Sequence, residues 1–330
     1  MDWLKLSENT AGARYIADEN DRPINLFGMA RSQACCATEL INYGGAGGVC
    51  AHFKALGCNI IRLAIHLRGD SGERGDMPTC DLVELCGGYN RDGINKFIDT
   101  FVEPDVRAIK QNGMYIQLDL HDYPPVQSDR EITEYARRHY IPVWRELAAR
   151  YVNDPCIAVY EIWNEPYPAD VASALKDSPE WIKSVREFYI EAVAEIRKTD
   201  KCHIIMASDY NAGWGKAWDN CWREHLDMLD TECRNTCFSI HVSDRQLDKE
   251  YPEYGEWLLE TAEKNNACLY LGEIETEGGI QTVKGIENLT ELLEKSEDTH
   301  HISAVLWRPH DDETNYVRYW QEFAKRYTRK

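Results

Sequence analysis

Two acidic residues stand where strongly apolar segments end, and this position could support acid–base chemistry. The segment 157–163 is mostly apolar and leads directly into Asn164 and Glu165, and the segment 269–272 leads directly into Glu273. An unpaired carboxylate in a protein core is very unfavourable, whereas one at the exposed end of a buried strand can remain reactive. One carboxylic acid that donates a proton and one carboxylate that attacks carbon can together carry general acid and nucleophilic catalysis.

Short apolar segments recur along the chain and predict the strands that must position these groups. Amphipathic segments alternate with them, such as 97–113, which ends in Gly113, and 178–198, which opens with Ser178 as N-cap and Pro179 at the first helical position. Strands that are apolar throughout indicate a parallel sheet buried on both faces. The eight predicted strands are Leu26–Ala30, Asn59–Ile65, Met114–Leu120, Ile157–Trp163, His203–Ala207, Phe238–His241, Leu269–Glu273 and Ser303–Trp307.

Eight repeats of strand and helix predict a closed (β/α)8 TIM barrel of the α/β class. An open doubly wound sheet is the structural alternative, but no GxGxxG follows the first strand. The segment 14–26 is predicted to form a small N-terminal β-hairpin, with "DEND" as its turn, that closes the bottom of the barrel. The sequence shows no linker or internal repeat, so residues 1–330 are expected to form a single catalytic domain.

Polar residues gather at the ends of the predicted strands, where the active sites of such barrels lie. An unsatisfied buried polar group costs about 1–3 kcal/mol, so the large number of polar residues at these strand ends needs an explanation. Two carboxyl groups that face each other across the barrel mouth fit glycoside hydrolysis, in which retaining enzymes place them roughly 5–5.5 Å apart. The polar and aromatic residues at these ends are Arg62, His66, Asp119, His121, Asn164, Glu165, His241, Glu273 and Trp307.

The order of these motifs resembles glycoside hydrolase family 5, whose members are cellulase-like retaining (β/α)8 glycosidases. The resemblance covers about residues 10–328, and it is carried by "RL" at 62–63, "DLHDY" around His121, "WNEP" at 163–166, His241, "GE" at 272–273 and Trp307. It implies Glu165 as the catalytic acid/base and Glu273 as the catalytic nucleophile. It also implies that no metal and no organic cofactor is needed.

The same resemblance implies roles in substrate binding for the residues around the two glutamates. Asn164 would hold the sugar 2-hydroxyl, and Arg62 would keep Glu273 ionised through its charge. Glu161 is expected to point into the barrel and to pair with Arg62 as structural support. Glu275 and Glu277 are alternative nucleophiles, although only Glu273 directly follows the apolar strand.

Aromatic and histidine side chains are expected to complete the sugar site. His121 and His241 would line it, and Trp307 would form its aromatic floor. Trp214 or Trp218, in the segment after the fifth strand, could stack on a pyranose ring or serve ordinary packing.

One motif departs from the family pattern at the end of the sixth strand. The family usually has His-x-Tyr there, with the Tyr hydroxyl in contact with the nucleophile, whereas this chain has His241-Val242-Ser243. The Ser243 side chain is too short for that contact. Either a tyrosine from another segment, such as Tyr210, replaces it or the loop is rebuilt.

Substrate specificity remains open among related activities. The resemblance favours an endo-β-1,4-glucanase acting on β-glucan or cello-oligosaccharides, with a β-mannanase or an exo-acting β-glucosidase as alternatives. A non-catalytic sugar-binding barrel is a further alternative, as is a metal-dependent hydrolase using Asp119, His121 and His66. An oligosaccharide or polysaccharide is the expected partner.

Composition argues against several other partners. The net charge is -19, and no run of Lys and Arg opposes it locally, so nucleic acid is not expected to bind. No apolar stretch reaches the roughly 18 residues of a membrane span. The first 20 residues lack the features of a signal peptide, so the chain as written is predicted to be cytoplasmic, or secreted if a leader has been removed.

Twelve cysteines would suit disulfides in an exported protein, but their positions favour free thiols. Cys58, Cys156, Cys202, Cys237 and Cys268 stand at the starts of apolar runs, where a small apolar side chain is expected to be buried. If any disulfide forms, the first candidate is the pair of residues 80 and 86.

Overall fold

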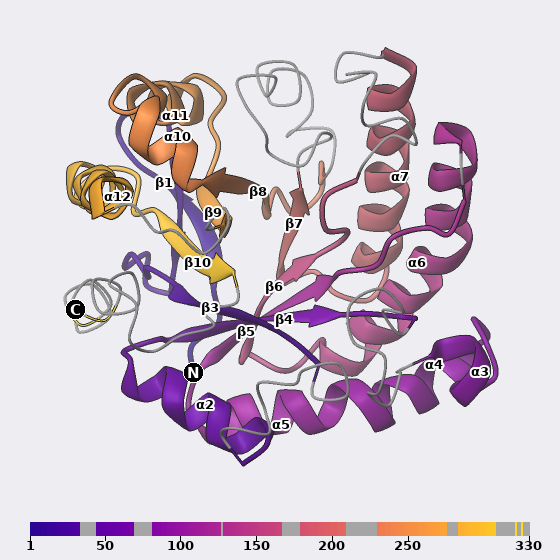
Figure 1. Cartoon of the computed structure of the whole chain (residues 1–330). Coiled ribbons are helices and arrows are strands. Elements are labelled where there is room, and N and C mark those ends of the chain that lie inside the picture. The colour runs from indigo at the N-terminus through magenta and orange to yellow at the C-terminus, as the bar shows by residue number, and fades with distance from the viewer. Residues whose placement is uncertain are drawn as a thin grey trace.

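The computed structural model describes residues 1–33, 44–68, 81–126, 128–166, 179–208, 230–275 and 283–307, together with residues 321 and 325. Eight parallel strands close into a barrel in the order β10-β3-β4-β5-β6-β7-β8-β9, and helices surround it (Figure 1). The predicted (β/α)8 fold is therefore confirmed. The strands are β3 (Phe27–Ser32), β4 (Ile60–Ile65), β5 (Tyr115–Leu120), β6 (Ile157–Glu161), β7 (Ile204–Ser208), β8 (Thr236–Ser243), β9 (Leu269–Glu275) and β10 (Ser303–Trp307).

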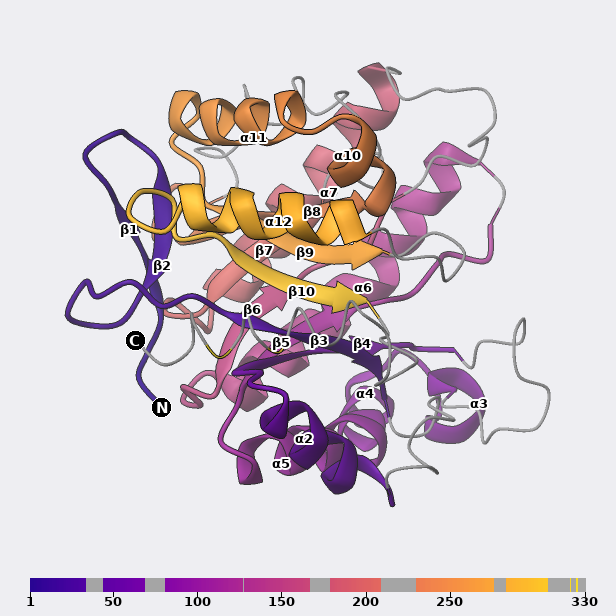
Figure 2. The same cartoon turned by 60° about the vertical axis from the view of Figure 1, so that its left-hand side comes forward.

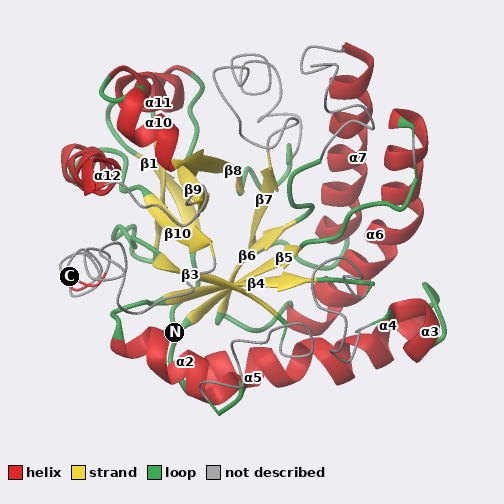
Figure 3. Ribbon diagram, in the orientation of Figure 1, coloured by secondary structure: helices red, strands yellow, loops and turns green. Residues whose placement is uncertain are grey.

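The helices follow the predicted alternation with the strands (Figure 3). The predicted helix 97–113 is the second part of a longer helical run that contains a π-helical segment, and Gly113 follows its end with a φ of 65°. Helix α7 begins at Pro179 as predicted, while Ser178 lies outside the described residues. The described helices are α2 (Ala46–Ala55), α3 (Leu82–Cys86), α4 (Arg91–Phe97), the π-helix η1 (Ile98–Val102), α5 (Glu103–Gln111), α6 (Asp129–Tyr151), α7 (Pro179–Arg197), α10 (Asp244–Lys249), α11 (Glu253–Lys264) and α12 (Val283–Lys295).

A two-stranded hairpin covers the end of the barrel from which the strands start (Figure 2). It pairs β1 (Lys5–Glu8) with β2 (Arg14–Ala17), so the prediction placed its turn wrongly. The "DEND" turn follows β2 and closes only one bridge, between Ala17 and Pro23. The longer ladder is made by β1, the strand before Arg14. Its sequence, KLSE, is polar and therefore did not predict a strand.

The alternation of side chains along each strand determines which groups enter the barrel. On β4, Ile61, Leu63 and Ile65 pack in the core between strands and helices, whereas Ile60 packs inside the barrel with the hairpin residue Ile16. Residues two positions apart share one face of a strand. The side chain after Ile60 on the inner face is therefore that of residue 62, and a buried arginine enters the barrel.

Gly28 permits the close approach of β3 to β4. A methyl group at this position would lie 1.9 Å from the carbonyl oxygen of Ile60. We expect Gly28→Ala to lower the free energy of unfolding by roughly 1–3 kcal/mol, because the backbone must shift. Gly47→Ala in α2, where an added methyl meets nothing within 4 Å, should leave stability equal or slightly higher. Denaturant unfolding measures both, and an unchanged midpoint for Gly28→Ala would contradict the steric argument.

The cysteines are free thiols where the structure describes them, as predicted, but their burial is uneven. Cys58, Cys237 and Cys268 are buried, whereas Cys156 is half-buried and Cys202 is exposed. The burial prediction was wrong for the last two because they lie in turns before β6 and β7 rather than within the strands. Cys86 is a buried free thiol, and its suggested disulfide partner, residue 80, lies outside the described residues.

The membrane prediction can be checked against the helices. In the described ranges, none is both long enough and apolar enough to cross a bilayer.

Candidate active site

Arg62 lies at the centre of a buried polar cluster inside the barrel. Its Nε donates to Glu161 at 2.7 Å, its Nη1 to Glu273 at 2.7 Å and its Nη2 to the Asn164 Oδ1 at 2.7 Å. Asp119 lies 3.1 Å from Nη2. The planar guanidinium, on β4, thereby fixes side chains from three other strands and from the segment after β6 in one orientation. The predicted pairing of Glu161 with Arg62 is therefore confirmed.

Burial and charge act in opposite directions on the carboxyl groups around Arg62. Burial raises the pKa of Asp119 well above its usual value, despite the nearby guanidinium. Burial would also raise the pKa of Glu161, but the charge and hydrogen bond of Arg62 hold that pKa below its usual range. The cluster therefore favours a proton on Asp119 and a negative charge on Glu161.

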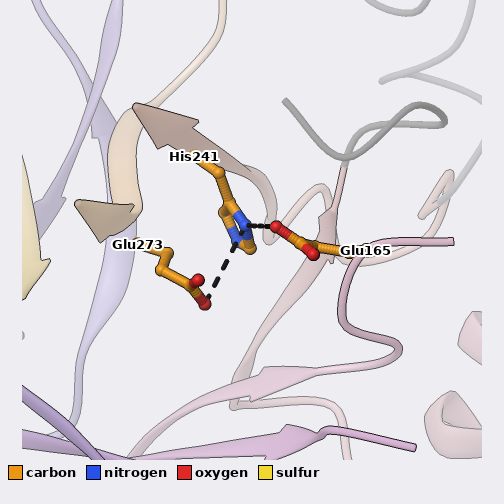
Figure 4. Close-up of side chains that lie close together, drawn as sticks. All are labelled: Glu165, His241 and Glu273. Atoms are coloured by element: carbon orange, nitrogen blue, oxygen red, sulfur yellow. Dashed lines mark hydrogen bonds and ion pairs between the residues drawn. The ribbon is translucent and has the colours of Figure 1, made fainter. Parts of the chain in front are cut away.

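His241 lies between Glu165 and Glu273, as Figure 4 shows. Its Nδ1 is 2.6 Å from the Glu165 Oε1 and 3.9 Å from the Glu273 Oε2. An oxygen of each glutamate and a ring nitrogen of His241 all lie within 4.8 Å of one another, and all three residues are buried. Burial alone would lower the pKa of His241, but the charge of Glu273, with Glu161 and Glu165, raises it well above 6.5. The Nδ1 of His241 is thereby placed to share a proton with Glu165.

The backbone at Glu165 adopts a conformation that few side chains tolerate. Its φ is 39°, in the left-handed region. The residue follows β6, which ends at Glu161, after a short segment that leaves the sheet. Non-glycine residues in this region store strain that the surrounding structure must offset, and such strain is concentrated at functional sites. Here the reversal lets Glu165, which is 7% exposed, reach across the barrel mouth to His241.

His121 and Trp307 form one wall of the site. The His121 Nδ1 is 2.8 Å from the Asp119 Oδ2, and its ring stacks on Trp307 with centroids 4.7 Å apart and planes at 8°. The Nδ2 of Asn164 lies 3.3 Å from the His121 Nε2 and donates to the hydroxyl of Tyr123 at 3.0 Å. Trp307 is half-buried, and the Arg62 guanidinium also lies over its ring, 5.5 Å from the centroid.

Seven of the eight predicted site residues therefore lie together: Arg62, His121, Asn164, Glu165, His241, Glu273 and Trp307. Trp214 lies outside the described residues, as do Trp218, Tyr210 and Glu277. The backbone of Ser243 pairs with that of Glu275 between β8 and β9, but the side chains of both residues lie outside the description.

Several polar groups that support the site were not identified from the sequence. Gln117 donates to Glu161 at 2.7 Å and accepts from the hydroxyl of Tyr270 at 2.6 Å. Ser208 donates to the other oxygen of Glu161 at 3.1 Å. Gln117 could have been identified, since it shares the inner face of β5 with Asp119. Tyr123, which is 44% exposed, stands in the quoted "DLHDY" motif but received no role.

We expect loss of the Arg62 charge to destabilise the fold strongly. Arg62→Met would leave buried carboxylates uncompensated and should cost about 3–5 kcal/mol, measured by urea unfolding. Arg62→Lys keeps the charge but not the planar guanidinium. Its loss of unfolding free energy should therefore lie between zero and that of Arg62→Met. Arg130→Met removes an 87% exposed partner of Glu134, which is itself 51% exposed, and should leave the unfolding midpoint almost unchanged. Similar losses at the two arginines would contradict a central role for Arg62.

Comparisons with known proteins agree with this architecture. Endoglucanase C of Acetivibrio thermocellus is 28% identical over 143 residues, 42% of this chain and 38% of that protein, so the chain spans well under half of that relative. A β-glucanase structure from Saccharophagus degradans has a TM-score of 0.65 at 15% identity, covering 99% of this chain and 94% of its own. The structure of endoglucanase Cel5A of Thermobifida fusca has a TM-score of 0.62 at 15% identity. The match covers 98% of this chain and 97% of the Thermobifida fusca chain. These two likenesses concern the fold. The family model described as cellulase (glycosyl hydrolase family 5) matches residues 17–313, and the chain belongs to this family.

Proposed function

We propose that this chain is a retaining β-glycoside hydrolase in which Glu165 is the acid/base and Glu273 the nucleophile. The observation that carries the proposal is the approach of the two carboxyl groups, which bring an oxygen of each within 4.8 Å across His241. Retaining glycosidases hold their carboxyl groups about 5–5.5 Å apart, whereas inverting enzymes need about 6.5–9.5 Å to admit a water. The short separation supports direct attack by one carboxylate.

In the first step, Glu273 attacks the anomeric carbon while the bond to the leaving oxygen breaks. The hydrogen bond from the Arg62 Nη1 stabilises the ionised form of Glu273 that this attack requires. Glu165 donates its proton to the leaving oxygen at the same time, so the departing group leaves as an alcohol. The product is a glycosyl ester on Glu273.

In the second step, Glu165 removes a proton from water, and the resulting nucleophile releases Glu273 from the sugar. The 2.6 Å contact with His241 places a second proton-binding group beside Glu165. This contact supports exchange of the proton between the two side chains during the cycle. His241 thereby stabilises Glu165 in the ionised form that it adopts between the two steps.

The remaining residues would bind the sugar. Asn164 is held by Arg62 and directly precedes Glu165 in the chain, which suits a contact to the 2-hydroxyl. Trp307, half-buried and stacked on His121, would supply the aromatic floor for the apolar face of a pyranose. Trp214 keeps its proposed place as a further stacking residue. We assign these roles to a single catalytic domain over residues 1–330.

We propose β-1,4-glucan or cello-oligosaccharides as substrates, cleaved internally. The similarity to a protein named endoglucanase C supports this choice, as does the β-glucanase of Saccharophagus degradans, whose structure has also been determined with cellotetraose. Both observations concern those proteins, and they favour a glucan over the alternative mannan.

A substrate panel tests the proposal. The chain is incubated with β-glucan, mannan, cello-oligosaccharides and an aryl β-cellobioside, and product lengths and the first anomer formed are recorded by chromatography and NMR. We expect mixed short cello-oligosaccharides with the β-anomer first. The α-anomer would exclude retention, and glucose alone would indicate an exo-acting enzyme. Cleavage of mannan alone would indicate a mannanase, and binding without turnover a sugar-binding barrel.

A further inference from the structure

The trio Glu165, His241 and Glu273 has the composition of a metal site as well as that of a catalytic site. Two carboxylates and one imidazole, all buried, bring one ligand atom each within 4.8 Å of the others. Figure 4 shows the His241 ring between the two carboxyl groups, with interactions to both. Three converging donors, from β8, β9 and the segment after β6, can bind one ion without rearrangement of the barrel.

The donor set is one that zinc prefers. Zinc binds imidazole nitrogen and carboxylate oxygen at about 2.0–2.2 Å, and zinc sites with three protein ligands leave a fourth position for water. Tetrahedral geometry at these bond lengths puts ligand atoms roughly 3.3 Å apart. The Nδ1 of His241 lies 2.6 Å from Glu165 and 3.9 Å from Glu273, on either side of this value. The two carboxyl oxygens, which lie within 4.8 Å of each other, would turn towards the ion to complete the geometry.

The groups behind the trio also suit a cation. The Nε2 of His241 is buried and has no hydrogen-bond partner within the described structure, and it lies 3.9 Å from the Glu161 Oε1. If Nδ1 bound a metal, Nε2 would carry the proton and point towards that carboxylate, the outer-shell arrangement found in many zinc sites. Glu273 is itself oriented by Arg62.

The balance of charged groups points the same way. Four acidic side chains surround Arg62 and His241, namely Asp119, Glu161, Glu165 and Glu273. Asp119 favours its protonated form, so a zinc ion that displaces the proton of His241 meets three carboxylates and one guanidinium, and electrostatic attraction for a divalent cation is strong in this buried setting.

We propose that Glu165, His241 and Glu273 bind one zinc ion, and that zinc and the sugar substrate exclude each other. The ion occupies the space between the two carboxyl groups, which the glycosidic bond must also enter. Zinc would therefore inhibit the enzyme competitively. Only the exclusion rests on the proposed function, whereas zinc binding follows from the three side chains alone.

Isothermal titration of the full chain with zinc sulfate tests the binding directly. Exposed thiols such as Cys202 also attract zinc, so they are first alkylated. We expect one saturable site per chain, weakened at least tenfold by His241→Asn and by Glu165→Gln. His52→Asn, in α2, is the matched control and should leave the affinity unchanged. Melting curves without zinc check that each variant is folded, and either folded variant suffices for the comparison.

The outcomes separate zinc binding from catalysis. Unchanged affinity in a folded His241→Asn or Glu165→Gln variant would overturn the site, as would loss of all binding on alkylation. A fluorosugar bound covalently to the active site should prevent zinc from binding. In steady-state kinetics, added zinc should raise KM and leave kcat unchanged. Zinc that binds at the trio without affecting turnover would overturn the exclusion. If the chain cleaves no glycoside yet binds zinc at the trio, only the proposed function fails.

Discussion

Glu273→Gln is expected to lower kcat on an aryl β-cellobioside by about four orders of magnitude or more. The amide keeps the shape of the side chain and can still contact Arg62, but it cannot form the glycosyl ester, so both steps of double displacement are lost. Steady-state kinetics on the purified variant measure the loss. Its unfolding midpoint checks that the variant is folded, since the amide keeps the volume of the side chain but removes a buried charge beside Arg62.

Covalent labelling identifies the nucleophile independently of the kinetics. A 2-deoxy-2-fluoro glycoside with a good leaving group slows both steps and should accumulate as an ester, which fragmentation mass spectrometry assigns to one residue. We expect the label on Glu273. Glu275, two residues along β9, is the matched control, and Glu275→Gln should retain most activity. A label on Glu275, or near-normal turnover by Glu273→Gln, would reassign the role.

The barrel could be predicted because its strands are buried on both faces. All eight predicted strands exist, and their ends shift by at most two residues. The shifts have local causes. β6 ends at Glu161, two residues early, because the chain leaves the sheet before its left-handed turn at Glu165. β8 extends in both directions because its neighbours β7 and β9 offer further ladder partners.

The candidate site was predictable where strand position alone determined it. Arg62, Glu161 and Glu273 follow from alternation along single strands and from the rule that barrel sites lie at strand ends. The contact of His241 with Glu165 was not predictable, because it depends on an irregularity between Ser239 and His241 in the pairing of β8 with β9. Register between distant strands leaves no trace in local composition.

The support beneath Glu161 was hidden for the same reason. Tyr270 reaches Gln117 across the interior of the barrel although 153 positions separate them in the chain. A tyrosine and a glutamine on separate strands give no joint signal in the sequence. Only closure of the barrel at a particular stagger brings the two side chains together.

Glu165→Ala is expected to discriminate between substrates by their leaving groups. Poor leaving groups such as a sugar hydroxyl need the proton, and their kcat/KM should fall by about 10²–10⁴-fold, the usual contribution of general acid catalysis. A dinitrophenyl β-cellobioside leaves without protonation, so its first step should be almost unaffected. For that substrate the second step becomes limiting, since water then lacks its general base.

This change of limiting step gives the variant a distinctive signature. Glu165→Ala should show a burst of dinitrophenol followed by a slow steady state, and its KM should fall because the glycosyl-enzyme accumulates. Azide, a nucleophile that needs no base, should enter the space left by the carboxyl group and restore turnover as a β-glycosyl azide. Equal losses on good and poor leaving groups, with no azide rescue, would contradict the acid/base role. Among the residues that the structure describes, His241 would then be the first candidate for the proton donor, since its Nδ1 lies within 4 Å of both glutamates.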